Sequence, residues 1–336
     1  MQSLAIRYRP KTFDDLTEQD AIKIILQNQL STNTIQHCYL FTGPAGTGKT
    51  TSARIFANEI NKGQGNPIEI DAASHNGVEE IRELVQQAKL QSVDSIYKTY
   101  ILDEVHVLSS ASWQALLKII EEPPQKTIFI MCTTNPEKIP NTILSRVQRY
   151  DFHKISPKGI VARIVKILEC EHITTYDLGA VEYIAKISEG GMRDALTSLD
   201  KCLAYSSNLT IESVVTALGI TGYDNMFELL FNFLDGQDQN IIQNIENLYA
   251  VGKDLKQYIK QFTDFVLDIC KYKITKGFDY IQIPQTYQKQ LDSVTEDLIP
   301  LLDTLVKLNS DLKYDGQPKL TIEATLLLKM KEIQGC

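Results

Sequence analysis

Along residues 1–152, segments whose hydrophobic and polar positions are arranged as in strands alternate with segments arranged as in helices. Short apolar runs typical of strands follow one another, and segments of helical period lie between them. This alternation predicts a parallel sheet covered by helices. The predicted strands are Cys38–Thr42, Ile68–Asp71, Thr99–Leu102, Thr127–Thr133 and Gln148–Phe152. The predicted helices lie near Asp20–Leu30, Thr50–Asn61, Val78–Ala88, Ala111–Ile120 and Asn141–Arg146.

From residue 156 onward the pattern has helical period only. Helices are expected at Pro157–Cys170, Asp177–Ser188 and Met192–Tyr205, followed by a helical stretch from near Thr210 to the end. The breaks expected in that stretch are Gly222, Gly236, Gly252, Gly277 and Pro284. The sequence therefore predicts an α/β domain at residues 1–154, a small helical domain at 155–206 and a larger all-helical domain at 207–336.

Composition places the chain among ordinary globular proteins. Of 336 residues, 43% are hydrophobic and 23% charged, and the net charge of −8 argues against a wholly basic nucleic-acid binder while leaving room for a local basic patch. The six cysteines form no C-x-x-C pair, which favours reduced core thiols over disulfides or zinc ligands. Without an apolar signal region or a stretch of membrane-spanning length, the protein is expected to be soluble and intracellular, with no membrane partner.

One glycine-rich segment carries the strongest chemical signal, a phosphate-binding loop of the pattern G-x-x-x-x-G-K-[ST]. Its residues are Gly43, Pro44, Ala45, Gly46, Thr47, Gly48, Lys49 and Thr50. The glycines allow successive N–H groups to face one anion, Lys49 would reach the β- and γ-phosphates, and the Thr50 hydroxyl would bind Mg²⁺. An accidental glycine-rich turn is the alternative. The strand before the loop and the helix after it favour nucleotide binding.

Two carboxylates follow the apolar run Tyr100–Leu102. Beside a phosphate loop, Asp103 would hold Mg²⁺ and Glu104 would polarise the water that attacks the γ-phosphate. Without that loop the pair would indicate only a strand that meets a solvated turn. Its position one helix–strand unit after the loop favours the catalytic interpretation.

Three further features allow two interpretations each. Thr133, Thr134 and the Asn-Pro turn that follows would orient the lytic water or simply cap a strand. Arg146 and Arg193 would stabilise transition-state charge or form ordinary surface ion pairs. Spacing alone assigns neither arginine a role.

Taken together, several segments resemble the gamma/tau subunits of bacterial DNA polymerase III, the AAA+ motors of the sliding-clamp loader. The segments are Tyr8–Phe13, His37–Phe41, Ala72–Val78, Asp103–Ser109, Leu116–Lys118, Glu121–Pro124, Ile143–Arg146 and Gly191–Leu196, with weaker likeness at Asn225–Leu229, Gly252–Leu255 and Lys319–Glu323. The resemblance covers essentially the whole chain. It implies a P-loop AAA+ domain with helices on both faces of a parallel sheet, a helical lid and an all-helical collar.

The resemblance also implies roles for individual residues. Thr133 and Thr134 match the first sensor, Arg193 matches the second sensor, and Arg146 matches the finger that completes a neighbouring subunit's ATP site. The residues expected to bind the nucleotide are Gly43, Pro44, Ala45, Gly46, Thr47, Gly48, Lys49, Thr50, Thr51, Arg7, Tyr8, Arg9, Pro10 and Arg193. Those expected to act in hydrolysis are Glu104, Lys49, Thr134, Arg193 and, in trans, Arg146, with Thr50 and Asp103 as Mg²⁺ ligands.

The chain departs from its bacterial relatives at two sites and at its end. A four-cysteine zinc module is replaced by Asn61–Pro67, so no zinc is expected there, and the finger motif Ser-Arg-Cys reads Ser-Arg-Val. The sequence also ends after the collar-like region, without a long tau-type extension. These features would fit a streamlined, phage-encoded loader subunit.

The sequence indicates contacts with DNA less clearly than it indicates the nucleotide site. The helices that open after Asn76-Gly77 and Ser109-Ser110 would offer backbone N–H groups, Arg82 and the hydroxyls of Ser109, Ser110 and Ser112 to a phosphate backbone. Ordinary helix caps with solvated charges are the alternative.

The function that the sequence supports best is an ATP- and Mg²⁺-dependent motor that loads a sliding clamp onto primed DNA. Its expected partners are the clamp, other loader subunits and primer–template DNA, in a pentameric ring in the bacterial cytoplasm. Two alternatives stay open: another AAA+ DNA machine, such as a replication factor C small subunit or a branch-migration ATPase, and a nucleotide-binding scaffold without hydrolysis.

Overall fold

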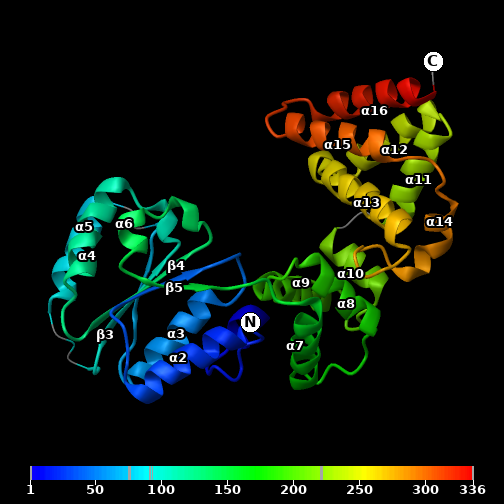
Figure 1. Ribbon diagram of the computed structural model, residues 1–336. Helices are drawn as coiled ribbons and strands as arrows, with labels where there is room; N and C mark the ends of the chain where they lie inside the picture. Colours follow the sequence, from blue (N-terminus) through cyan, green and yellow to red (C-terminus); the bar gives the residue numbers. More distant parts are fainter. Residues whose placement is uncertain (1, 75–76, 91, 93, 220–221, 335–336) are drawn as a thin grey trace. The chain divides into compact units, whose positions relative to one another are not determined.

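The computed structural model describes residues 2–74, 77–90, 92, 94–219 and 222–334 (Figure 1). The chain divides into two compact units, residues 1–207 and 208–336. A further division of the first unit near residue 154 stays a prediction. Among the helices of the described ranges, none has the length and apolar character required to span a bilayer.

The first unit is built on a five-stranded parallel sheet with strand order β2-β3-β4-β1-β5. The strands are β1 Cys38–Thr42, β2 Ile68–Asp71, β3 Lys98–Asp103, β4 Thr127–Thr133 and β5 Gln148–Asp151. Strands β1 and β3 therefore both pair with β4, and all three end at the same edge of the sheet. Side chains that follow the ends of these strands therefore lie close together at that edge.

Helices cover both faces of the sheet, because apolar side chains of successive strand residues point to opposite sides. On β1, Leu40 packs toward α4 and α5 whereas Phe41 packs toward α2 and α3. The helical elements of this part are α1 Leu4–Arg7, α2 Asp20–Thr32, α3 Lys49–Ile60, α4 Val78–Ala88, η1 Val105–Val107, α5 Ser110–Glu121, η2 Pro136–Lys138 and α6 Asn141–Leu144. The predicted α/β class is confirmed, with α1 as a short element that periodicity did not predict.

Three more helices complete the first unit: α7 Pro157–Cys170, α8 Leu178–Ile187 and α9 Met192–Tyr205. Helix α7 begins where the Ser156 hydroxyl accepts a hydrogen bond from the Gly159 amide at 3.0 Å. Helix α1 lies against α9, and the Leu4 amide donates to the Asp200 carboxylate at 2.7 Å. The N-terminal segment is thereby fixed against α9.

The second unit is helical throughout its described residues. Its elements are α10 Ile211–Leu218, α11 Tyr223–Leu234, α12 Asp238–Ala250, α13 Leu255–Thr275, η3 Gln285–Tyr287, α14 Gln288–Ser293, α15 Ile299–Leu312 and α16 Pro318–Gln334. Helix α13 packs on α15 through buried residues such as Phe262 and Leu305. Each predicted break, from Gly222 to Pro284, lies between two of these elements.

Candidate nucleotide site

The loop between β1 and α3 adopts backbone conformations that favour glycine. Gly43, Gly46 and Gly48 have φ values of 136°, 72° and 103°. A Cβ atom on Gly43 would lie 2.2 Å from the Phe152 carbonyl oxygen, and one on Gly46 would lie 2.9 Å from the Cα of Gly191. Because the Met192 amide also donates to the Gly46 carbonyl at 3.0 Å, the loop is held directly against the start of α9.

Lys49 opens α3 and is only 6% exposed. Its ammonium group donates to the carbonyls of Gly43 and Pro44, both at 2.7 Å, so the side chain folds back over the loop. Burial lowers the pKa of Lys49, and the nearby carboxylates of Glu104 and Asp103 oppose that effect. A buried cation next to a ring of loop N–H groups is well suited to an anionic ligand.

Thr50 and Asp103 meet across the edge of the sheet. The Thr50 hydroxyl donates to the Asp103 carboxylate at 2.9 Å, which joins the start of α3 to the end of β3. A hydroxyl and a carboxylate are the oxygen groups that Mg²⁺ prefers. The two residues predicted as metal ligands therefore lie together, beside Lys49, and fit the ion that phosphoryl transfer uses.

Glu104 has a left-handed backbone conformation with φ 48° and is held by three groups. Its Oε2 accepts from the Thr134 amide at 3.1 Å and from the Thr134 hydroxyl at 2.9 Å, and it lies 3.1 Å from His106 Nδ1. Thr133 supports the same cluster, because its hydroxyl lies 3.2 Å from His106 Nδ1 and accepts from the Asn135 amide at 3.0 Å. The structure thus joins the predicted water-polarising carboxylate to the predicted sensor threonines.

His106 is the residue of this cluster that sequence reasoning missed. It lies in η1, two positions after Glu104, and its side chain is 17% exposed. The signal was present as the short spacing Asp-Glu-Val-His, but a lone histidine has many structural uses and its contact depends on the 3-10 turn. Its position against Oε2 makes it a positioning residue for Glu104.

Most of the predicted nucleotide-binding residues line one cavity of about 570 Å³ in the first unit; Gly43, Pro44 and Arg7 are not among its lining residues. Tyr8, Arg9 and Pro10 lie on one part of its wall, and Arg193 lines it from the first turn of α9. Loop and carboxylate residues complete the wall: Ala45, Gly46, Thr47, Gly48, Lys49, Thr50, Thr51, Asp103 and Glu104. The cavity therefore joins the phosphate loop, both carboxylates and an exposed arginine.

Arg7 does not line this cavity, although it was predicted to bind the nucleotide. Its guanidinium forms an ion pair with Glu171 at 2.9 Å, and the Tyr8 hydroxyl donates to the same carboxylate. These two hydrogen bonds lower the pKa of Glu171. The Arg163 guanidinium in turn donates to the Tyr8 carbonyl at 2.8 Å. Arg7 thus fixes the segment whose neighbours Tyr8, Arg9 and Pro10 reach the cavity.

Arg146 also lies outside the cavity wall, just after α6. Its Nη2 is 2.9 Å from Glu121 Oε1, and its Nη1 donates to the Thr142 carbonyl at 2.8 Å and the Ser145 hydroxyl at 3.0 Å. Both members of the Arg146–Glu121 pair are about 40% exposed. The guanidinium is therefore available at the surface rather than committed to its own chain's nucleotide site.

The candidate DNA contacts have ordinary structural roles. Ser109 caps α5 by accepting from the Ser112 amide at 3.1 Å, Ser110 is exposed in the first turn, and Arg82 pairs with Glu79 at 2.5 Å. Asn76 lies outside the described residues. These contacts leave the DNA assignment a prediction.

Cysteine chemistry does not add a second site within the described ranges. Cys38, Cys132 and Cys202 are buried free thiols, and burial raises the pKa of each. Among the residues that the structure describes, no group of three or more His, Cys, Asp or Glu side chains is found that could hold a metal ion.

Three successive segments of the chain match families of DNA polymerase III subunits. Residues 64–156 match a family described as DNA polymerase III, delta subunit, and residues 159–208 match the ATPase lid domain of the DNA polymerase III clamp loader subunit. Residues 209–330 match domain III of the DNA polymerase III subunits gamma and tau. The three matches follow one another along the chain with short gaps.

Similar curated proteins carry the same names. The chain is 33% identical to the DNA polymerase III subunit gamma of Buchnera aphidicola, with 96% of this chain and 95% of that protein covered. It is 35% identical to the tau subunit of Bacillus subtilis, with 97% of this chain but 62% of that protein covered. The chain thus spans less than two thirds of the Bacillus relative.

Among solved structures, the Holliday junction branch migration motor RuvB of Thermotoga maritima is similar in fold. The TM-score is 0.54 at 18% identity, over 74% of this chain and 86% of that one. At that identity the likeness shows a shared fold alone. Together with the sequence matches, the geometry of the loop and carboxylates leads to one conclusion: the chain belongs to the family of the gamma and tau subunits of bacterial DNA polymerase III, the clamp-loader AAA+ ATPases that use nucleotide and Mg²⁺.

Proposed function

We propose that this chain is an ATP-hydrolysing motor subunit that loads a sliding clamp onto primed DNA during replication. One observation carries the proposal: Lys49, Thr50, Asp103 and Glu104 line one cavity, Thr50 bonds Asp103, and Thr134 holds Glu104 from the neighbouring strand end. A scaffold that binds nucleotide without hydrolysing it has no need of Glu104 held in this way.

Within the site, each residue has a chemical task. Lys49 and the loop N–H groups would hold the phosphates, and Thr50 with Asp103 would hold Mg²⁺, which supplies charge neutralisation when bound. Glu104 would accept a proton from the attacking water, with its orientation set by Thr134 and His106. Tyr8, Arg9 and Pro10, which line the same cavity, would contact the base.

The two arginines would act from different subunits. Arg193 lines the chain's own cavity and would contact the γ-phosphate in cis. Arg146 lies at the surface outside that cavity and would complete a neighbour's site in trans, where an added positive charge stabilises the transition state. This arrangement supports a ring of loader subunits, and we infer a pentamer in which the second unit forms the collar.

The remaining predictions are part of the same proposal. The sliding clamp, other loader subunits and primer–template DNA would be its partners in the bacterial cytoplasm, with Asn76, Arg82, Ser109 and Ser110 as candidate DNA contacts. The three-domain division at residues 154 and 206 also stays a proposal. No structural zinc is expected in the Asn61–Pro67 interval, and elemental analysis after chelation would check this.

The experiment compares ATP turnover of the full chain, assembled with its loader partners, in the presence of two kinds of DNA. Turnover is expected to rise with primed DNA plus clamp and to be indifferent to Holliday junctions. Stimulation by junctions instead would favour a branch-migration ATPase.

The Glu104→Gln variant tests the catalytic assignment. It should bind ATP as the wild type does and lose turnover by a factor on the order of a hundred or more, because it loses the base at nearly constant volume. Glu182→Gln, an exposed position on α8, makes the same charge change outside the cavity and serves as the control. Undiminished hydrolysis in Glu104→Gln would contradict the proposal.

A further inference from the structure

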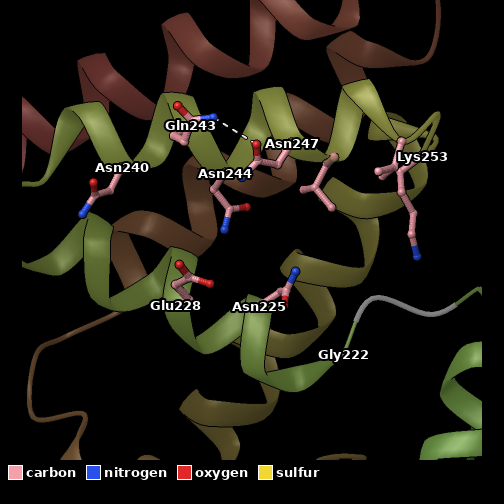
Figure 2. A pocket seen from close by; sticks show the side chains of 10 residues that line it. Gly222, Asn225, Glu228, Asn240, Gln243, Asn244, Asn247 and Lys253 are labelled. Carbon is pink, nitrogen blue, oxygen red and sulfur yellow. Dashed lines mark hydrogen bonds between the residues drawn. The ribbon is translucent and has the colours of Figure 1, made fainter.

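The second unit has a polar pocket of about 370 Å³ between α11 and α12 (Figure 2). Most of its polar lining consists of side-chain amides and a carboxylate: Asn225, Glu228, Asn240, Gln243, Asn244 and Asn247. The chemistry proposed for the nucleotide site does not explain why these polar side chains line a pocket here. The pocket lies wholly within the second unit and does not depend on the function proposed above.

Asn244 forms the floor of the pocket and is only 8% exposed. Figure 2 shows its amide directed between the helices, toward Glu228 and Asn225. Its Oδ1 is buried without a hydrogen-bond partner in the described chain. An unpaired buried acceptor costs free energy, so a ligand that brings a hydrogen-bond donor is favoured here.

Two of the neighbouring amides bond elsewhere and so do not reach Asn244. The Gln243 amide donates to Asn247 Oδ1 at 3.0 Å, and the Asn240 amide donates to Gln237 Oε1 at 2.5 Å. Lys253, the one base among the described lining residues, donates to the Gly219 carbonyl at 3.0 Å. Glu228 is exposed, and no salt bridge to it is found within the described residues.

Acidic residues predominate in the sequence of the two helices that form the pocket, although Lys253 lines it and Lys319 pairs with Glu246. No Lys or Arg occurs between Lys201 and Lys253. The carboxylates in that interval are Glu212, Asp224, Glu228, Asp235, Asp238 and Glu246. Both helices that form the pocket therefore carry a net negative formal charge, which favours a cation over an anion.

We propose that this pocket binds the guanidinium group of an arginine side chain from a partner protein. The planar guanidinium presents five N–H donors in a fixed fork, which matches a carboxylate flanked by amide oxygens better than an ammonium does. In the bound state Glu228 accepts a charge-assisted pair of hydrogen bonds and Asn244 Oδ1 gains a donor.

The second unit has no arginine of its own, so the guanidinium has to come from outside that unit. All eight lie at or before Arg193. Those with acceptors or ion pairs in the same chain are Arg7, Arg54, Arg82, Arg146, Arg149 and Arg163. Arg9 and Arg193 line the nucleotide cavity.

In the test, a blocked pentapeptide, Ala-Ala-Arg-Ala-Ala, is titrated into the deuterated full chain. Amide-detected NMR of the chain then reports binding. Matched peptides carry lysine or the neutral isostere citrulline at the centre. The arginine peptide should produce saturable shifts at the Asn225 and Asn244 side-chain amides. The lysine peptide should bind more weakly, and the citrulline peptide should cause no saturable shift.

Two variants locate the binding. Glu228→Gln should weaken the arginine peptide by about tenfold or more, because it removes the charged acceptor. Asp235→Asn makes the same charge change in the same acidic interval outside the pocket lining, and should bind like the wild type. Thermal melts establish that both variants are folded. Unsaturable shifts, equal affinity for arginine and lysine or citrulline, or equal weakening in both variants would overturn the proposal.

Discussion

The nucleotide cavity of the first unit and the pocket of the second unit are suited to ligands of opposite charge. The cavity is lined by Lys49, Arg9 and Arg193 and by the phosphate loop, and the carboxylates Asp103 and Glu104 are the groups proposed to hold a metal ion and a water. In the pocket, Glu228 and amide side chains stand without a free base among the described lining residues.

The two sites also differ in what builds them. The cavity depends on backbone geometry: glycines with positive φ, a strand edge and the start of a helix. The pocket depends on side chains spaced three and four apart on α12, such as Asn240, Asn244 and Asn247, facing Asn225 and Glu228 of α11. Backbone-built sites leave a motif in the sequence, whereas sites built from two helix faces do not.

The largest expected effect is a substitution that abolishes ligand binding at one site and leaves binding at the other unchanged. Lys49→Ala should abolish tight Mg-ATP binding, because it removes the buried cation at the phosphates, while the arginine peptide should bind unchanged. Fluorescent-nucleotide titration and the NMR assay measure the two affinities on one preparation.

Lys166→Ala, an exposed lysine on α7, is the control for lost positive charge. Retention of ATP affinity in Lys49→Ala would show that other groups hold the phosphates. A loss of peptide binding in the same variant would show that the two sites are coupled.

The features that could be predicted from the sequence are those with local causes, as in the backbone-built cavity. The strands, the phosphate loop, Asp103 and Glu104 were predictable because each is a local pattern with a local cause. The order β2-β3-β4-β1-β5 was not, since periodicity carries no information on which strands pair. The contact of Gly46 with Gly191 depends on how α9 packs, which lies beyond any spacing rule.

Partners of individual side chains were the least predictable. Arg7 was expected at the nucleotide but pairs with Glu171, 164 residues away in sequence. His106 reached Glu104 only through the turn η1, and the floor position of Asn244 required the pairing of α11 with α12. Each of these contacts joins elements whose relative placement the sequence pattern leaves open.

A second, smaller effect is expected at the surface arginine. Arg146→Ala should leave ATP binding intact and reduce hydrolysis by a factor on the order of a thousand, because a finger stabilises charge that develops in the transition state. Equilibrium nucleotide titration and steady-state turnover separate the two.

Mixing subunits sharpens this test. When Arg146→Ala and Lys49→Ala subunits exchange, some sites combine an intact loop with a neighbour's intact arginine, so part of the activity should return. If nothing returns while wild-type subunits exchange normally, the shared-site arrangement is wrong.

A still smaller loss is expected from His106, which touches Glu104 rather than the substrate. His106→Ala should lower kcat by about tenfold to a hundredfold with ATP affinity unchanged, because Glu104 keeps only its Thr134 hydrogen bonds. His106→Asn places an amide donor near the position of Nδ1 and should restore part of kcat. Equal losses in both variants, or a rise in KM alone, would remove His106 from its positioning role.

The smallest expected effect concerns the ion pair that holds Arg146 in the isolated chain. Its Nη2 lies 2.9 Å from Glu121 Oε1, with both side chains about 40% exposed, so the pair contributes on the order of 0–1 kcal/mol. If Arg146 must leave Glu121 to reach a neighbour, Glu121→Gln lowers that cost. Hydrolysis in the assembled ring should then rise by up to about fivefold, which is what 1 kcal/mol gives. Glu122→Gln is a control for charge at the adjacent exposed position. A fall in hydrolysis specific to Glu121→Gln would mean that the pair orients the arginine for its neighbour instead of restraining it.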